Sequence, residues 1–224
     1  MVIRMIKGAI FDMDGTLLDS MPVWEHASER YLQEKGICVQ EKLSEVLFSM
    51  SMHEGARYVK EKYGLTEDED EIVAGVNRIV FEAYETAVQP KDGVRELLER
   101  LKQEGIPMAV ATSTDRPMME AALTRTGLTS YFQGIFTCSE VGAGKVKPDI
   151  YFAAAECLGT KPRETWVFED ALYALKTAKL AGFRTVGLYD AASGKDQDEI
   201  AARADIYCVG LTEELFDKIS GEVL

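Results

Sequence analysis

The chain has 224 residues, of which 46% are hydrophobic and 28% are charged, as is typical of a globular protein with one large domain or with a domain that carries a sizeable insertion. Its formal net charge of −13 argues against a nucleic-acid-binding protein, because phosphate backbones require a basic surface. A phosphorylated ligand would also meet a repulsive average field, so any phosphate site would need positive charge supplied locally.

Nothing in the chain indicates a membrane or an oxidising compartment. No apolar run approaches the roughly 18 consecutive residues of a transmembrane helix, and the chain opens without the pattern of a signal peptide. The four cysteines are widely scattered, with no C-x-x-C pair and no histidine at metal-binding spacing. We therefore expect a cytoplasmic protein with no membrane partner and with reduced thiols.

The first part of the chain predicts one strand followed by a long helical stretch. Residues 8–11 are a short apolar run that ends in an acidic turn, and the next comparable run lies far along the chain. Between the two runs, apolar residues repeat at helical spacing. Ser20 and Pro22 are typical of a helix start, and Thr66 with Glu69 predicts a capping box for a second helix.

From Pro90 onward, strand and helix patterns alternate. Asp92 is the predicted N-cap of the first helix of this region, and Gly105 is expected to end that helix. Alternating strands and helices imply a parallel sheet with helices on both faces. The predicted strands are residues 106–112, 134–137, 165–168, 184–188 and a short one near Ile206, and the helices between them are residues 118–127, 149–158 and 172–182, with another after Gly194.

The strand at residues 8–11 must join this sheet, because alone it has nothing to pair with. The chain is therefore expected to be an α/β protein with a doubly wound, mostly parallel sheet. Residues 1–17 and 90–224 would form the core domain, and residues 18–89 a small helical cap domain inserted after the first strand. Ligands of open α/β sheets bind at the carboxyl ends of the strands, so the functional residues are expected at that edge.

The acidic turn after the first strand can divide a catalytic task between two carboxylates. It reads Asp12-Met13-Asp14-Gly15-Thr16. Asp12 could attack a phosphorus atom, while Asp14 could protonate the leaving oxygen and later take a proton from water. A solvated turn is one alternative. A calcium-binding loop is another, but it would need a third ligand before its glycine.

Three further polar segments fall at or near the carboxyl ends of predicted strands. One apolar strand ends in the hydroxyls of Thr112, Ser113 and Thr114, which could also simply cap the next helix. Lys145 lies in a loop that lacks the first glycine and the hydroxyl of a phosphate-binding P-loop, and a lone lysine is normally surface charge. Glu169 and Asp170 form an acidic pair at the end of another strand, where burying charge requires a cation or hydrogen-bond donors nearby.

Taken in this order, the segments resemble the haloacid dehalogenase-like superfamily and, within it, the β-phosphoglucomutase-like phosphatases. The resemblance spans nearly the whole chain: DMDGTLLDS follows the first strand and VATST the second, and K-V-K-P-D-I-Y and VFEDALYALKTAKLAGF come later. It implies a Rossmann-like core with a cap domain. It also implies a Mg²⁺-dependent phosphatase that hydrolyses small phosphomonoesters, such as sugar phosphates or phosphoglycolate, through an aspartyl-phosphate.

The resemblance implies a role for each residue of the expected site. Asp12 would be the nucleophile and Asp14 the general acid/base. The transferred phosphoryl group would be bound by Thr112, Ser113 and Lys145. The positive charge of the metal and of Lys145 would offset the repulsion between the attacking carboxylate and the phosphate, which the chain as a whole does not do.

The metal ligands implied by the resemblance are Asp12, Asp14 through its backbone carbonyl, Glu169 and Asp170. Ligands that are all oxygen suit Mg²⁺ rather than zinc. The chain also departs from the family's common pattern. Val146 stands where Pro is usual, and Ala171 and Ala174 stand where Ser and Gly are usual. The missing Ser removes one hydroxyl near the metal, but none of the three changes removes a catalytic group.

Two alternatives to a phosphatase remain. A sugar-phosphate mutase of the same superfamily would carry an Arg in the cap and a His after the first motif, and by spacing Met52 and Trp24 take those positions, which favours hydrolysis. The cap does offer His53, Arg57 and Arg78 as cations. A non-catalytic binding protein of the same fold would be expected to lack the catalytic carboxylates, which are all present. The expected partner is a small phosphorylated metabolite.

Overall fold

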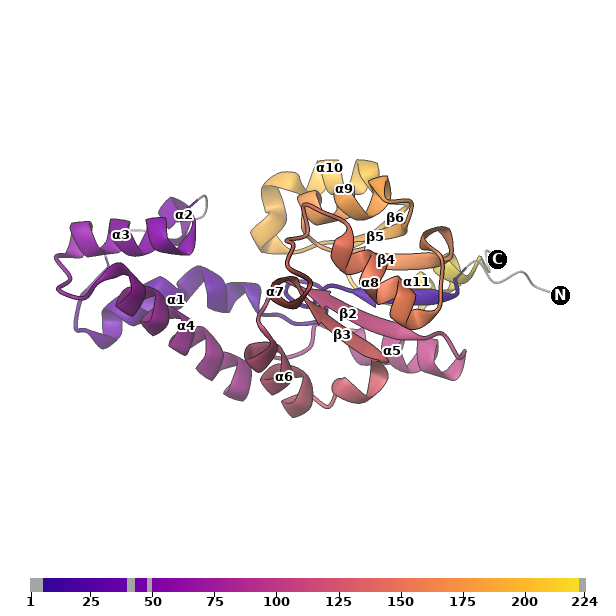
Figure 1. Ribbon diagram of the computed structural model, residues 1–224, viewed down its shortest axis with the longest axis horizontal. Coiled ribbons are helices and arrows are strands. Elements are labelled where there is room, and N and C mark those ends of the chain that lie inside the picture. Colours follow the sequence, from indigo (N-terminus) through magenta and orange to yellow (C-terminus); the bar gives the residue numbers. More distant parts are fainter. Residues whose placement is uncertain (1–5, 40–42, 48–49, 222–224) are drawn as a thin grey trace. The chain divides into compact units, whose positions relative to one another are not determined.

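The computed structural model describes residues 6–39, 43–47 and 50–221, and a six-stranded sheet lies at its centre (Figure 1). All the strands are parallel, and their order is β3-β2-β1-β4-β5-β6. The predicted doubly wound α/β fold is therefore confirmed, including the pairing of the first strand with strands from much later in the chain. The strands are β1 (Gly8–Phe11), β2 (Met108–Thr112), β3 (Gly134–Thr137), β4 (Thr165–Glu169), β5 (Arg184–Leu188) and β6 (Ile206–Cys208).

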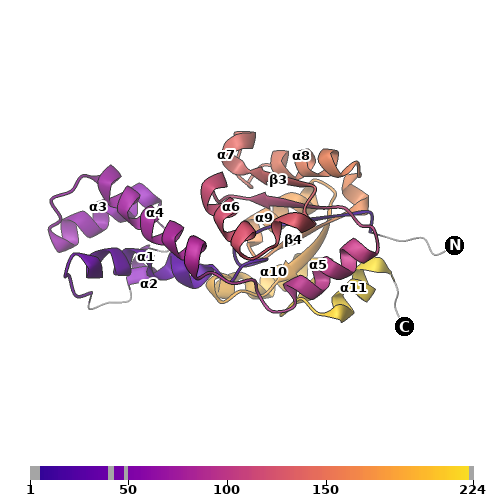
Figure 2. The same ribbon diagram turned by 90° about the horizontal axis from the view of Figure 1, so that it is seen from below.

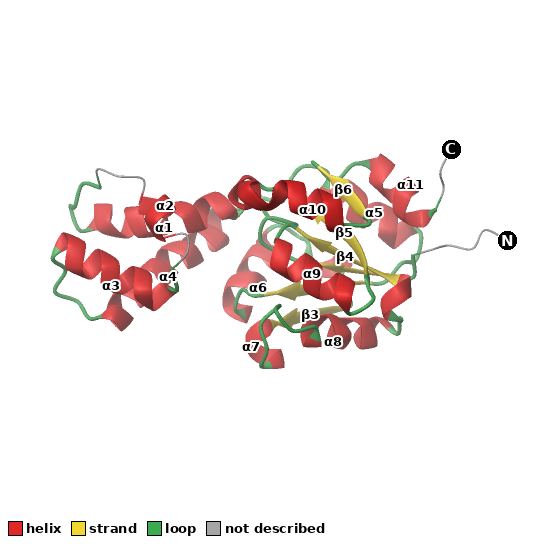
Figure 3. Ribbon diagram, turned by 90° about the horizontal axis from the view of Figure 1, so that it is seen from above, coloured by secondary structure: helices red, strands yellow, loops and turns green. Residues whose placement is uncertain are grey.

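Helices cover both faces of the sheet, as right-handed crossovers between parallel strands require. Helices α8, α9 and α10 lie on one face, and α5, α6 and α11 on the other (Figures 1 and 3). None of the described helices is both long and apolar enough to cross a bilayer. The helices that follow β1 in this part of the chain are α5 (Val94–Gln103), α6 (Arg116–Arg125), α7 (Cys138–Val141), α8 (Asp149–Leu158), α9 (Leu172–Leu180), α10 (Gln197–Arg203) and α11 (Glu213–Ser220), with short 3₁₀ turns η1 (Thr129–Tyr131), η2 (Pro162–Glu164) and η3 (Ala191–Asp196).

The chain forms two compact units. The sheet and its helices belong to Met1–Asp19 and Gln89–Leu224, whereas Ser20–Val88 form a second unit made of helices alone. The second unit contains α1 (Met21–Glu34), α2 (Leu43–Leu47), α3 (Met52–Tyr63) and α4 (Glu69–Thr86), labelled in Figure 2. That this unit is a cap over a site, with boundaries at residues 18 and 89, stays a prediction.

The helical unit is held together mainly by contacts of α4 with α1 and α3. A glycine in the middle of α4 makes the α1 contact possible, because a Cβ at Gly75 would lie 2.2 Å from the ring of Tyr31. On the same pair of helices, the indole nitrogen of Trp24 donates a hydrogen bond of 2.9 Å to the hydroxyl of Tyr84. Both Tyr31 and Tyr84 are buried, so the unit has an apolar core of its own.

Two predicted helix caps are wrong. Helix α4 begins at Glu69 with Asp68 as its N-cap, and the capping box joins Asp68 and Glu71 through bonds of 2.8 and 2.9 Å. The carboxylate of Asp68 takes the place predicted for Thr66, whose hydroxyl instead donates to its neighbour Glu67 at 3.4 Å. In the sheet-bearing unit, Gly93 rather than Asp92 is the N-cap of α5.

The cap at Gly93 is explained by a close approach of two backbone segments. Gly93 has a φ of +80°, and a Cβ there would lie 1.6 Å from the carbonyl oxygen of Leu211. Any other residue would be excluded sterically as well as strained. The start of α5 is therefore fixed by its contact with the segment after β6 rather than by a side-chain cap.

Candidate active site

The sheet brings the predicted site residues to one edge. Asp12 directly follows β1, Thr112 ends β2, and Glu169 ends β4 with Asp170 next in the chain. Because β1 lies between β2 and β4 and all three are parallel, their carboxyl ends are neighbours (Figure 1). Lys145 reaches the same place from the loop that precedes α8, since its ammonium contacts both Asp12 and Glu169.

A buried ammonium is the centre of the cluster. Lys145 Nζ donates to Asp12 Oδ1 and, at 2.7 Å, to Glu169 Oε1. The side chains of Lys145, Asp12 and Glu169 are only 2%, 8% and 1% exposed, respectively. Charges withdrawn from water to this extent are tolerated only when they are paired and hydrogen-bonded. Lys145 is thus not the surface lysine that its sequence context alone would suggest.

The pKa values of the cluster reflect a shortage of positive charge. Burial raises the pKa of Asp12 well above its ordinary value, the Glu169 and Asp170 carboxylates add to the rise, and Lys145 only partly opposes it. Burial, followed by the charge of Glu169, raises the pKa of Asp170 to about 7. Burial disfavours the charge on Lys145, but Asp12 and Glu169 outweigh it and raise the pKa of the ammonium. One ammonium does not balance the carboxylates around it.

The geometry of the cluster fits a hard divalent cation. Asp12, Glu169 and Asp170 each offer a carboxylate oxygen, and these oxygens all lie within 4.8 Å of one another. Glu169 Oε2 is buried and has no hydrogen-bond partner in the described part of the chain, which is costly unless another group binds it. Oxygen donors alone suit Mg²⁺. The carboxylate of Asp14 is not among these three.

Asp14 is held by Thr114, the third residue of the hydroxyl segment predicted at the end of the second strand, although this contact itself was not predicted. Thr114 Oγ1 donates a hydrogen bond of 2.6 Å to Asp14 Oδ2. Thr114 in turn has its backbone N–H directed at the hydroxyl of Thr112, at 3.0 Å, so the turn after β2 is closed by its own side chains. The motif VATST contains Thr114, and its position past a strand end was the available signal.

Thr112 and Ser113 differ in exposure although they are adjacent. Thr112 is fully buried, and Ser113 is exposed at the edge with its hydroxyl 3.5 Å from the sulfur of Cys138. Thr112 is the last residue of β2, and Ser113 directly follows that strand. Ser113 is therefore the more accessible of the two hydroxyls.

The carboxylate of Asp170 is packed against the loop that carries the first motif. Gly15 has a φ of +81°, and a Cβ there would lie 2.4 Å from Asp170 Oδ2. Only glycine combines that backbone conformation with such a close approach. Two hydroxyls also donate hydrogen bonds to Asp170: Thr16 Oγ1 to Oδ1 at 3.3 Å, and Ser193 Oγ to Oδ2 at 3.4 Å. Ala171, where the family commonly has Ser, adds no hydroxyl.

A second lysine ties the same loop to the rest of the sheet-bearing unit. Lys91 Nζ donates to the backbone carbonyls of Gly15 and Tyr189, at 2.9 and 3.0 Å, and to Asp190 Oδ2 at 2.8 Å. Asp190 is buried just past the end of β5, and its charge contributes to the raised pKa of Asp170. Asp190 could have been found by the rule that placed the other carboxylates at strand ends, whereas no local pattern marks Lys91.

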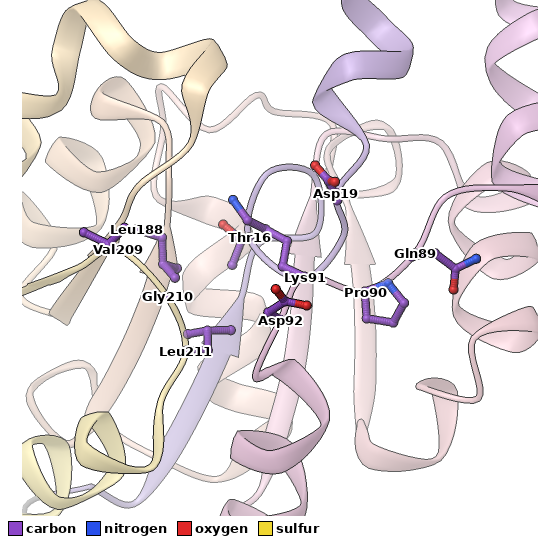
Figure 4. A pocket seen from close by; sticks show the side chains of 10 residues that line it. All are labelled: Thr16, Asp19, Gln89, Pro90, Lys91, Asp92, Leu188, Val209, Gly210 and Leu211. Carbon is purple, nitrogen blue, oxygen red and sulfur yellow. The ribbon is translucent and has the colours of Figure 1, made fainter.

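Lys91 also lines a cavity of about 400 Å³ beside the first motif (Figure 4). Thr16 and Leu188 are among the other residues of its wall, and Lys91 extends toward Thr16 in this view. None of the clustered carboxylates lines the cavity. The cavity is thus a neighbour of the cluster and not the space into which the carboxylates point.

The three cations noted above in the helical unit, His53, Arg57 and Arg78, are each paired with carboxylates of that unit. Arg57 Nε donates to Glu69 at 2.8 Å, and His53 Nε2 lies 3.1 Å from a carboxylate oxygen of Asp70. The guanidinium of Arg78 donates hydrogen bonds to the carboxylates of Glu34 and Glu82. These pairs are exposed, and each is therefore a weak and readily exchanged interaction.

A family model for haloacid dehalogenase-like hydrolases matches residues 6–182 of the chain. The chain belongs to this family. The hydrolase is 32% identical to validoxylamine A 7'-phosphate phosphatase from Streptomyces hygroscopicus subsp. limoneus, over 93% of the chain and 96% of that relative. It is 31% identical to hexitol phosphatase A from Escherichia coli strain K12, over 81% of the chain and 82% of that relative.

Among solved structures, the hydrolase is similar to a Thermotoga maritima protein that carries the provisional name beta-phosphoglucomutase. The two share 27% sequence identity with a TM-score of 0.82, over 98% of this chain and all of the other. The match confirms the resemblance to β-phosphoglucomutase-like members of the superfamily. It also agrees with the parallel sheet and strand order described above.

We expect Lys145→Met to destabilise the hydrolase strongly in the presence of a chelator. The substitution keeps most of the volume but leaves buried carboxylates without their counter-charge, so the free energy of unfolding should fall by about 3–5 kcal/mol near neutral pH. Burial already raises the pKa values of Asp12 and Asp170, the loss of the Lys145 charge would raise them further, and such groups bind more protons when folded. Stability is then lost as the pH rises, so the deficit should be larger at about pH 8 than at about pH 5.5.

Urea unfolding followed by circular dichroism at both pH values would measure this effect. Lys179→Met is a matched control, because Lys179 also has two acceptors, the backbone carbonyl of Arg203 and the carboxylate of Asp205, but in an exposed position away from the cluster. Its effect should be within about 1 kcal/mol. Equal losses in the two variants would mean that the buried charge cluster is not what Lys145 stabilises.

Proposed function

We propose that this hydrolase is a Mg²⁺-dependent phosphatase that releases phosphate from small phosphomonoesters by way of an aspartyl-phosphate on Asp12. One observation carries the proposal: a buried carboxylate at the end of the central strand is paired with the ammonium of Lys145 and lies beside two further carboxylates. A carboxylate can attack an anionic phosphoryl group only where positive charge offsets their repulsion. The names of the two curated relatives, both phosphatases, support the class of reaction.

In the first step, an oxygen of Asp12 would attack the phosphorus atom. A bond forms between that oxygen and phosphorus while the bond to the substrate's ester oxygen breaks, which leaves the phosphoryl group on Asp12. Lys145, whose ammonium already donates to Asp12, would also donate to the phosphoryl oxygens and offset their negative charge. Thr112 and Ser113, at the adjacent strand end, would supply the other donors to those oxygens.

Asp14 would manage the protons of both steps. It would donate a proton to the ester oxygen as it leaves, and then accept one from the water that attacks phosphorus. Inorganic phosphate would depart and the Asp12 carboxylate would be regenerated. The hydroxyl of Thr114, 2.6 Å from Asp14 Oδ2, would hold this side chain in one orientation for both transfers.

The metal would be held by Asp12, Glu169, Asp170 and the backbone carbonyl of Asp14. When bound, Mg²⁺ would supply the positive charge that draws phosphate and nucleophile together. The orphaned Oε2 of Glu169 supports this assignment, because a cation would satisfy it. The two hydroxyls on Asp170 would keep that carboxylate oriented.

The substrate proposed is a small phosphorylated metabolite, with a sugar phosphate as the first choice. The curated relatives named above act, by their names, on a phosphorylated validoxylamine and on a hexitol phosphate. The helical unit is proposed to be a cap that restricts the site to small substrates, with its boundaries at residues 18 and 89. The expected cytoplasmic location agrees with such a substrate and stays a prediction.

A mutase is the second candidate, because the Thermotoga maritima neighbour carries a mutase name. A mutase must bind a second phosphate on the cap, usually through a fixed Arg. Here Trp24 and Met52 stand where mutases carry the His and the Arg: Trp24 is bound to Tyr84 through its indole nitrogen, and Met52 has no charge. These contacts favour water as the acceptor of the phosphoryl group.

We therefore expect free phosphate to accumulate in step with substrate loss. The assay incubates the enzyme with glucose 1-phosphate and a trace of glucose 1,6-bisphosphate, and follows both phosphate and glucose 6-phosphate. Isomer that formed much faster than free phosphate would favour the mutase. Arg57→Met would then be the variant that shows whether this arginine binds the second phosphate.

The covalent step can be tested with Asp12→Asn, which keeps the size of the side chain but removes the attacking carboxylate. We expect phosphate release to fall by at least about 1,000-fold, and the acid-quenched enzyme to lose the label acquired from ³²P-substrate. In the wild type, that label should be released by hydroxylamine, as acyl phosphates are, and its formation should require Mg²⁺. Asp198→Asn, on an exposed turn of α10, is the matched control and should behave as wild type. Full activity of the wild type after exhaustive chelation would refute the metal assignment.

The role of Asp14 predicts a dependence on the leaving group. Asp14→Asn should slow alkyl phosphates severely, because an alkoxide leaves poorly without a proton, and should slow 4-nitrophenyl phosphate much less. Thr114→Val removes the hydroxyl that donates to Asp14. It should show the same dependence on the leaving group, with a loss of rate at least about a tenth as large as that of Asp14→Asn. Rates over a series of phosphate esters with different leaving groups would measure this dependence for both variants. Equal losses on every ester would show that Asp14 is not the proton donor.

A further inference from the structure

Tyr151 is a polar side chain in a place where the core is otherwise apolar. It is fully buried on α8, among residues such as Ile10 and Ala109 from the strands below. Its hydroxyl donates a hydrogen bond of 2.7 Å to Glu169 Oε1, the oxygen that also accepts from Lys145. A buried phenol hydroxyl requires a hydrogen-bond partner, whereas a phenylalanine at this position would require none.

The position of the ring leaves its hydroxyl little freedom. Helix α8 packs on β1, β2 and β3, and the ring of Tyr151 lies 6.1 Å from that of Phe183, centre to centre. Interiors packed in this way hold a side chain in one rotamer. Burial, followed by the charge of Glu169, raises the pKa of the Tyr151 phenol well above its ordinary value. The phenol therefore keeps its proton and acts as a donor to the carboxylate.

The two oxygens of Glu169 are used very differently. Oε1 accepts both hydrogen bonds, one from the Lys145 ammonium and one from the Tyr151 hydroxyl, each at 2.7 Å. Oε2 is buried with no hydrogen-bond partner among the described residues. Two donors from different directions fix the rotation of a carboxylate about its last bond, which a single donor does not. The plane of the carboxylate, and with it the direction of Oε2, is thus set by Lys145 and Tyr151 together.

We propose that Tyr151 is a positioning residue that turns Glu169 so that its Oε2 faces the Mg²⁺ position. The proposal rests on the proposed function, in which Glu169 is a metal ligand. It goes further by giving the aromatic residue that follows the lysine loop a role in metal affinity. Partners that orient a metal ligand through its second oxygen typically change metal affinity by about 10- to 100-fold.

The test is Tyr151→Phe, which removes one oxygen atom and leaves the ring in its place. We expect the Kd for Mg²⁺, measured by isothermal titration calorimetry on the whole chain without substrate, to rise by about 10- to 100-fold. The rise in Tm on adding a fixed concentration of Mg²⁺ should shrink accordingly. At saturating Mg²⁺ the kcat should return to within about threefold of wild type, and the KM for the phosphate ester should change little.

Tyr131→Phe is the matched control. Tyr131 also donates its hydroxyl to a glutamate, Glu99 Oε2 at 3.2 Å, but it lies at a more exposed position away from the carboxylate cluster. This variant should keep the wild-type Kd for Mg²⁺. If both variants lost the same Tm in chelator and both kept the wild-type Kd, the hydroxyl of Tyr151 would serve folding alone and the proposal would be wrong.

The outcome separates this proposal from the proposed function. A wild-type chain that binds no Mg²⁺ in the calorimeter and turns over in chelator would overturn the metal assignment, and the role of Tyr151 with it. A wild-type chain that binds Mg²⁺, together with an unchanged Kd in Tyr151→Phe, would overturn only the positioning role. Should Tyr151→Phe fail to fold, Tyr151→Met, which also lacks the hydroxyl, takes its place with the same expected Kd.

Discussion

The crowding of buried carboxylates around a single ammonium is the constraint on which the site depends. Lys145 balances only part of the charge of Asp12, Glu169 and Asp170. Each remaining oxygen must be satisfied by a donor or by a cation, because isolated buried charge is prohibitive. The hydroxyls of Thr16 and Ser193 meet part of that requirement, and Gly15 lets the first loop approach Asp170. Among the described residues, Glu169 Oε2 is left without a donor.

The parallel sheet is what makes such crowding possible. Strand β1 lies at the centre, so the residue after it has neighbours from β2 on one side and β4 on the other. Residues distant in the chain thereby meet at one edge without any special loop. The long helical stretch does not disturb the sheet, because the chain leaves and returns side by side: the N–H of Asp19 donates to the carbonyl of Gln89 at 2.9 Å, and Leu18 bridges to Pro90.

Sequence reasoning predicted the sheet well because buried parallel strands are short apolar runs, and residues 134–137 and 184–188 have the bounds predicted for them. The carboxylates were found by their place at strand ends. The capping box of α4 was placed two residues too early, which is a local error, but two other misses have a different cause, since they depend on long-range contacts. Gly93 caps α5 because of Leu211, and Lys91 donates to three acceptors in two distant segments of the chain. No local pattern encodes a partner that lies a hundred residues away.

The three bonds of Lys91 have a consequence for how the chain can vary. Lys91 lies in the segment by which the chain returns from the helical unit, yet its acceptors all belong to the sheet-bearing unit. These three bonds therefore fix the position of the return segment through contacts with the sheet-bearing unit. Helices of another length or sequence between Ser20 and Val88 would leave every one of these bonds in place. The helical unit can therefore vary while the loop that contains Gly15 keeps the same anchor in the sheet-bearing unit.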